Sequence, residues 1–480
     1  MTDDVGPSTA QFFTTHTPSD HPKDADPVDK EIASLVKDFS DDELRKFFSL
    51  EDTIQWIITN SYRRVALQLP DQCLSRACRI AKLIESHTNA KTFVLADTSY
   101  RSCCVDEVAA AHASCDAIVH YGDACLSALT EKIPVKFVFG SFPVDITAFE
   151  GVMPYLSCTK DRPVLLLTDA CYSDSMAALE EAVERCLPST QIYRAAVVDP
   201  TQEIAHDVLN NTLSFGRIMP RELCEASSVF LCFVGGTTSP LLSLWLMTYP
   251  QCESVIVFDP QTSAIQQQSS HSLRQLRKRL FLIEKLRDAH TVGLVVGTVG
   301  VRGHIEAVQR VRKLCKAAGK RLYVISVGKI NVPKLSNFAE IDAFILLSCP
   351  FGIILDSSDY FRPILSMFEA EMALNPSKSW SGYDKWSADF TSFTNDEVGC
   401  LDGDHTDVSL VTGRIRAGPA ADSEAKNSGE ILPYEKGDYF KSRTWRGLDA
   451  DVRLDESTKV EEGRTGTALS YDTEPPTLKE

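Results

Sequence analysis

Short apolar runs alternate with amphipathic segments along most of the chain. Each run is followed by a turn rich in Gly, Asp, Thr or Ser, and then by a stretch with helical periodicity. Nearly continuous hydrophobic strands that alternate with helices are typical of parallel sheets whose two faces are buried. The predicted strands lie at 64–70, 91–97, 117–122, 135–140, 163–174, 192–200, 229–236, 254–260, 291–300, 320–328 and 343–350.

This theme occurs three times, which predicts an α/β protein with three similar parallel-sheet domains around a shared centre. We expect two short helices within 29–60, because apolar residues recur there with helical spacing. The predicted ranges are 1–28 for a disordered polar N-terminus, 29–155, 156–285 and 286–375 for the three domains, and 376–480 for a C-terminal extension that is partly disordered.

Composition narrows the possible functions. The 480 residues include 49 Lys plus Arg and 66 Asp plus Glu, a formal net charge of -17, which argues against a surface that binds nucleic acid directly. The N-terminus lacks the pattern of a secretory signal, and the apolar runs are shorter than the roughly 18 residues of a membrane span. We therefore expect a cytoplasmic protein without membrane partners, whose 15 cysteines are thiols or metal ligands.

Four cysteines stand out because they follow predicted strands. Cys103 and Cys104 come after 91–97, Cys125 comes after 117–122, and Cys349 follows the apolar residues of 343–350 and precedes Pro350. Ligands of parallel sheets bind beyond the carboxyl ends of the strands, so these thiols are candidates for a functional rim. Cys171 has the matching place in the second domain, as a fourth ligand or as a bystander.

The spacing of these cysteines favours an iron–sulfur cluster over zinc. A structural zinc site normally includes a CxxC-like pair, and these cysteines contain none. Three distant cysteines can hold three irons of a cubane cluster and leave the fourth iron open to a small molecule. The chain also lacks a CxxxCxxC run.

The sequence around these residues resembles the diphthamide biosynthesis family. The similarity is carried by "ADTSYRSCCVDEVAA", "IVHYGDACLS", "GKRLYVISVGKINVPKLSNFAEIDAFILLSCP" and "FRPILSMFEAEMALNP". The C-terminal "DVSLVTG" is similar to the second of the two homologous subunits found in eukaryotes. These motifs recur in order over roughly residues 30 to 475.

The resemblance implies a fold, a cofactor and partners. It implies three α/β domains around a [4Fe–4S] cluster, and transfer of a 3-amino-3-carboxypropyl group from S-adenosylmethionine to a histidine of elongation factor 2. It also implies a heterodimer whose first subunit holds the catalytic cluster and binds most of the S-adenosylmethionine, while the second subunit supports reduction of that cluster. Electrons would come from a small iron-binding donor and an NADH-dependent reductase.

Residue by residue, the family pattern assigns the iron ligands to Cys104, Cys125 and Cys349, and Cys103 could replace its neighbour. The second-domain loop "FVGGTTSP" has no cysteine, a departure from one cysteine per domain in catalytic members. An auxiliary iron–sulfur subunit is therefore the expected function, and no catalytic residue is assigned. The alternatives are a catalytic homodimer, a cluster-free scaffold for the partner, and an enzyme of the quinolinate-synthase type.

Overall fold

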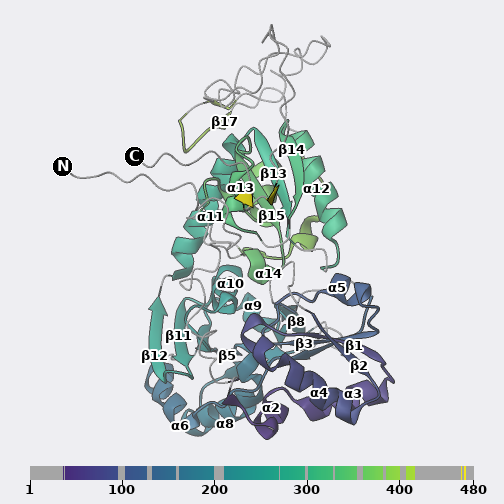
Figure 1. The fold of residues 1–480 in the computed structure, drawn as a ribbon. Helices are drawn as coiled ribbons and strands as arrows, with labels where there is room; N and C mark the ends of the chain where they lie inside the picture. Colours follow the sequence, from purple (N-terminus) through teal and green to yellow (C-terminus); the bar gives the residue numbers. More distant parts are fainter. Residues whose placement is uncertain are drawn as a thin grey trace, which may run out of the picture. The chain divides into compact units, whose positions relative to one another are not determined.

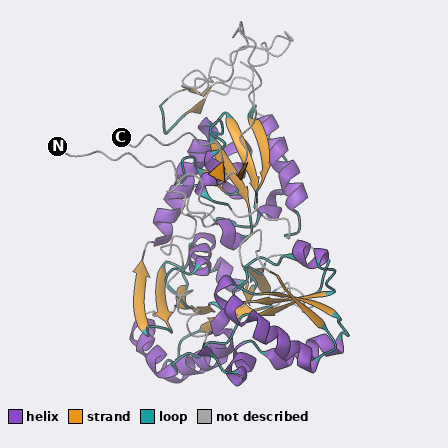
Figure 2. Cartoon of the chain, viewed as in Figure 1, coloured by secondary structure: helices purple, strands orange, loops and turns teal. Residues whose placement is uncertain are grey.

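Three parallel sheets organise the computed structural model (Figure 1). The structure describes residues 36, 38–95, 103–126, 132–157, 162–198, 210–269, 271–297, 301–327, 330–353, 360–381, 385–399, 407–413, 415–416, 466–467 and 470–471. The predicted N-terminal segment 1–28 and Cys400 lie outside these residues. The α/β class predicted from the sequence is confirmed, with helices and strands alternating along the chain (Figure 2).

The first sheet has the order β2-β1-β3-β4, and all its pairs are parallel. Its strands are β1 (Arg64–Gln68), β2 (Lys91–Leu95), β3 (Ala117–Tyr121) and β4 (Val135–Val138). The accompanying helices are α2 (Asp41–Phe47), α3 (Leu50–Thr59), a 3-10 turn (Asp71–Arg76), α4 (Ala77–His87) and α5 (Glu107–His112). Alternate side chains of β1 enter two cores: Val65 and Leu67 pack with α4, whereas Ala66 packs with α5. Both faces are therefore covered, as the continuous apolar runs predict.

The second sheet has the order β12-β11-β10-β5-β6, in which only the edge strand β12 is antiparallel. Its strands are β5 (Val164–Thr168), β6 (Ile192–Arg194), β10 (Phe230–Val234), β11 (Ser254–Asp259) and β12 (Ala264–Ser269). The helices of this part are α6 (Ile146–Phe149), α7 (Met153–Leu156), α8 (Met176–Cys186), α9 (Glu222–Glu225) and α10 (Pro240–Thr248), with 3-10 turns at Glu150–Val152 and Ala170–Ser175. The predicted strand 163–174 is shorter than expected, because the chain turns into a 3-10 helix after Asp169.

The third sheet, with the order β14-β13-β15-β16, is again entirely parallel. Its strands are β13 (Thr291–Val296), β14 (Arg321–Ser326), β15 (Ala343–Leu347) and β16 (Ile364–Leu365). Its helices are α11 (His271–Asp288), α12 (His304–Ala317), α13 (Val332–Ser336), α14 (Pro350–Ile353) and α15 (Met367–Leu374).

The three sheets share one topology. In each, the first parallel strand lies between the second and the third, and the fourth pairs with the third. Such an order places a crevice at the carboxyl ends of the first and third strands, where neighbouring connections leave in opposite directions. The sheets fall one in each predicted domain range, while the domain boundaries themselves stay a prediction.

Several small elements were not predicted. A three-stranded antiparallel sheet joins β7 (Ala196–Val197), β8 (Asn211–Ser214) and β9 (Arg217–Pro220), and short hairpins pair β17 (Asp407–Val408) with β18 (Ile415–Arg416) and β19 (Gly466–Thr467) with β20 (Ser470–Tyr471). The predicted strand 192–200 divides between β6 and β7, which pair in different sheets. Residues 1–424 form one compact unit and residues 425–480 a second. Among the described helices, none has the length and apolarity required to cross a bilayer.

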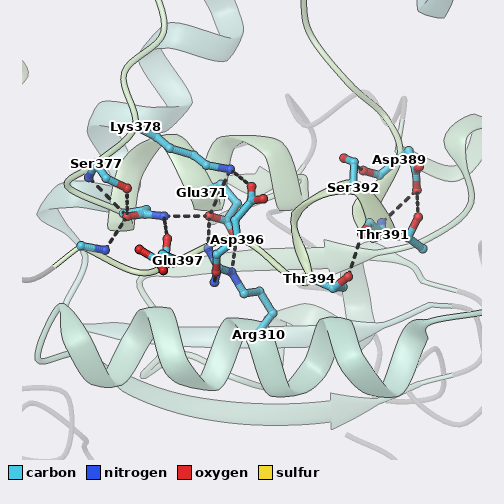
Figure 3. Close-up of polar contacts among 12 residues, drawn as sticks. Arg310, Glu371, Ser377, Lys378, Asp389, Thr391, Ser392, Thr394, Asp396 and Glu397 are labelled. Carbon is cyan, nitrogen blue, oxygen red and sulfur yellow. Dashed lines mark hydrogen bonds and ion pairs between the residues drawn. The ribbon is translucent and has the colours of Figure 1, made fainter.

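The chain after α15 is fastened to the helices of the third sheet. Trp386, Phe390 and Phe393 are buried in the core that includes α11, α12 and α15, and a 3-10 turn spans Phe390–Phe393. A buried ion pair joins Arg310 of α12 to Glu371 of α15, and Arg310 also donates to the carbonyl of Asp396 (Figure 3). This part of the predicted extension is thus folded against the third sheet's helices. Its aromatic side chains anchor it, although its overall composition is polar.

Candidate metal centre

The four candidate cysteines lie after strands of the first and third sheets. Cys103 and Cys104 form a turn before α5, Cys125 follows β3, and Cys349 follows β15 directly before α14. β3 and β15 are the third strands of their sheets, so two of these residues occupy equivalent places in the shared topology. The third strand of the second sheet, β10, is followed instead by Gly235.

The structure brings all four thiols together. Their Sγ atoms all lie within 4.8 Å of one another, and the Sγ atoms of Cys103 and Cys349 are 3.7 Å apart. The residues are between 0 and 7 % exposed. Four buried thiols are the ligand set of a single tetrahedral metal ion or of a [4Fe–4S] cluster. Cys104, Cys125 and Cys349 are therefore adjacent as the sequence predicts, and Cys103 joins them.

Backbone hydrogen bonds hold the three loops in place. The amide of Cys125 donates to the carbonyl of Cys103 at 3.2 Å, which ties the two loops of the first sheet together. The amide of Gly352 donates to the carbonyl of Cys349 at 2.9 Å and closes the first turn of α14. Gly352 is also required for space, because a Cβ there would lie 1.9 Å from Oγ of Ser348.

The environment separates the acidities of these thiols. Hydrogen bonds from Cys103, Cys104 and Cys125 lower the pKa of the Cys349 thiol well below its ordinary value. Contact with Cys104, Cys125 and Cys349, together with burial, raises the pKa of the Cys103 thiol. The surroundings therefore favour the thiolate form of Cys349 and disfavour that of Cys103, and the thiolate is the form that binds a metal.

Gln68, at the end of β1, was not singled out by the sequence analysis. Its side chain is 2 % exposed, donates to the carbonyl of Cys104 at 2.7 Å and accepts from the amide of Asp106 at 2.9 Å. It thereby fixes the turn that presents Cys103 and Cys104. The available signal was a polar residue inside an apolar strand, which needs hydrogen-bond partners when it is buried.

Gln68→Leu is expected to loosen this turn and lower the free energy of unfolding by about 1–3 kcal/mol, because a buried carbonyl and a buried amide both lose their partner. The measurement is the alkylation rate of the peptide that carries Cys103 and Cys104, read by mass spectrometry, alongside urea unfolding. Gln55→Leu is the matched control, since Gln55 is exposed on α3. Equal alkylation in the two variants would contradict the positioning role.

At the carboxyl ends of its first and third strands, the second sheet has a carboxyl group and a glycine in place of cysteines. The carboxyl of Asp169, just after β5, accepts a 2.6 Å hydrogen bond from Oγ of Ser239. Burial, and next the charge of Asp123, raise the pKa of Asp169 to about 7. Burial also lowers the pKa of Arg217, which is 1 % exposed. Gly235 leaves room for this carboxyl, because a Cβ there would lie 2.2 Å from its Oδ2.

Cys171 lies in the second-sheet region and does not join the four-cysteine group. Of the two alternatives from the sequence, the structure places it as a bystander. Its neighbours are carboxylates: burial, followed by the charges of Asp169 and Asp123, raises the pKa of this thiol well above its ordinary value. What sets Cys171 apart is its position, because the group whose Sγ atoms lie within 4.8 Å of one another consists of the other four cysteines.

Several known proteins are similar to this chain in sequence or in fold. A family model described as "Putative diphthamide synthesis protein" matches residues 69–386. The 2-(3-amino-3-carboxypropyl)histidine synthase subunit 2 of Caenorhabditis elegans is 45% identical over 96% of this chain and 98% of its own length, and that of Xenopus laevis is 35% identical over 90% and 93%. Among solved structures, Dph2 from Pyrococcus horikoshii with a 4Fe-4S cluster matches with a TM-score of 0.55 at 20% identity, over 71% of this chain and 94% of that one.

Proposed function

Because the chain belongs to the diphthamide synthesis family, we propose that it is the iron–sulfur subunit of a cytoplasmic heterodimeric transferase. The reaction moves a 3-amino-3-carboxypropyl group from S-adenosylmethionine to a histidine of elongation factor 2. The first subunit of the pair binds most of the S-adenosylmethionine, and this chain supports reduction of the partner's cluster. The electrons come from a small iron-binding protein and an NADH-dependent reductase.

The observation that carries this proposal is the buried group of four cysteines. Their thiols converge from two sheets, within 4.8 Å, on the rim where parallel sheets place their ligands. Cys104, Cys125 and Cys349 are the residues that would hold the [4Fe–4S] cluster, which supplies one-electron chemistry when bound. The surrounding chain contributes loop positions and exclusion of water.

Two features support an auxiliary role over a catalytic one. Cys349 is fully buried and the other three cysteines are 5 to 7 % exposed, so a protein side chain has little access to them. An electron needs no such access. The second sheet presents Gly235 and the Asp169–Ser239 pair in place of a thiol, which supports the same assignment.

The test is anaerobic quantitation of iron and sulfide, with EPR after dithionite reduction, on this chain co-expressed with its first-subunit partner. Cys349→Ala in the same complex is expected to lose one cluster's worth of iron and sulfide while the partner's signal remains. Cys315→Ala is the matched control, because Cys315 is a buried thiol of α12 outside the group.

The rival functions predict other outcomes. A cluster-free scaffold predicts the same iron content in wild type and Cys349→Ala, and diphthamide formation that survives the substitution. A catalytic homodimer predicts cleavage of S-adenosylmethionine by the reduced chain alone. One metal ion per chain without sulfide would indicate a single tetrahedral ion held by four thiolates and would overturn the iron–sulfur assignment.

A further inference from the structure

Cys103 meets every geometric condition that the other three cysteines meet. Its Sγ lies 3.7 Å from Sγ of Cys349 and within 4.8 Å of the other two. Its exposed fraction, 7 %, is close to the 6 % of Cys104 and the 5 % of Cys125. Nothing in this geometry marks one of the two adjacent cysteines as the ligand and the other as a spare.

The turn at Cys103 and Cys104 explains how two neighbours can face one point. In an extended strand, successive side chains point to opposite sides. Here the chain turns before α5, and each backbone carbonyl of the pair accepts a hydrogen bond from a separate donor. The amide of Cys125 donates to the carbonyl of Cys103, and the side chain of Gln68 donates to the carbonyl of Cys104. Both thiols therefore reach the same group while their backbone is pinned from two directions.

We propose that Cys103 and Cys104 are both ligands, so that four thiolates from this chain saturate the cluster and leave no iron open to S-adenosylmethionine. This inference rests on the proposed function, because it assumes that a cluster is present. Four cysteines are the complete ligand set of a [4Fe–4S] cluster, one per iron. A saturated site exchanges electrons without forming a bond to a substrate, whereas a three-cysteine site keeps one iron available. A cluster held by all four cysteines would therefore exchange electrons and would not bind S-adenosylmethionine.

The test exploits the lability of an iron that lacks a thiolate. Mild oxidation by ferricyanide removes one electron and one Fe2+ from a [4Fe–4S]2+ cluster and leaves a [3Fe–4S]+ cluster, which EPR detects. The complex with the first subunit is compared as wild type, Cys103→Ala, Cys104→Ala and Cys115→Ala. Cys115 is the control, a buried cysteine of the first sheet region outside the group.

In the wild-type and Cys115→Ala complexes, we expect a [3Fe–4S] signal from the partner's cluster and none from the cluster of this chain. Cys103→Ala and Cys104→Ala are each expected to form roughly one additional [3Fe–4S] spin per complex, or to lose this chain's cluster. Added S-adenosylmethionine should shift this chain's EPR signal in those two variants and leave it unchanged in wild type.

Two results would overturn the inference. If one of the two variants matches wild type while the other loses the cluster, only three cysteines bind iron. If wild type itself yields a second [3Fe–4S] signal, the site is open. These results leave the proposed function intact, whereas a wild-type complex that contains only the partner's iron and sulfide removes both the proposed function and the inference.

Discussion

Glu371→Ala is expected to lower the free energy of unfolding by about 3–5 kcal/mol, because it leaves the guanidinium of Arg310 buried without its counter-charge. Nε and Nη2 of Arg310 donate to the two carboxylate oxygens of Glu371 at 2.6 and 2.9 Å. The two side chains are 3 % and 0 % exposed, so water cannot replace the lost partner. The same carboxylate accepts from the side-chain amide of Asn375 at 3.4 Å, where the chain leaves α15.

The measurement is urea unfolding monitored by circular dichroism and by tryptophan fluorescence, to which the buried Trp386 contributes locally. The double variant Arg310→Met with Glu371→Leu is the control, since it removes both charges and keeps apolar volume. It should be clearly more stable than Glu371→Ala. A double variant as unstable as the single one would show that packing, and not the unpaired charge, determines the loss.

Asp169→Asn is expected to have little effect below about pH 4 and to stabilise the protein by an amount that grows as the pH rises toward 7. The pKa of Asp169 is about 7 in the folded chain against 3.8 without burial, so the folded state holds a proton that the unfolded state releases. The unfolding free energy therefore falls as pH rises from about 4 to about 7, and the charged form costs up to about 4 kcal/mol above that range. Asparagine removes the titration and can still accept from Ser239.

Urea unfolding midpoints between pH 5 and pH 8.5 measure this difference. Asp174→Asn is the matched control, because Asp174 is exposed in the 3-10 turn just beyond Asp169. The gain for Asp169→Asn should grow with pH, while Asp174→Asn should follow wild type throughout. A constant offset across the pH range would mean that Asp169 does not titrate there.

The parallel strands were predictable because burial on two faces requires continuous apolar runs. β5 and β15 are buried at every position, and their continuous apolar runs were sufficient to find them. The edge strand β12, with the sequence AIQQQS, was missed because its polar side chains resemble a loop. β8 and β9 were missed for a similar reason, since antiparallel pairing is set by partners that a local pattern does not contain.

Part of the site was predictable, because the place of a cysteine directly after a buried strand is visible in the sequence. Cys125 and Cys349 follow buried strands, and the rule for parallel sheets places such residues at one rim. That both Cys103 and Cys104 face that rim depends on the turn geometry and on Gln68, which sequence spacing does not encode. The Arg310–Glu371 pair was equally hidden, because its partners come from two helices far apart in the chain.

Cys103 and Cys349 touch although 246 positions separate them in the sequence. Ribosomes add about 5–20 residues per second, so the last thiol of the group is made roughly 10–50 s after the first. Of the four thiols in the group, iron delivered to the emerging chain would find only the three of the first sheet region. The complete set of thiols exists only once the third sheet has been synthesised, and assembly factors therefore need to act on a nearly finished polypeptide.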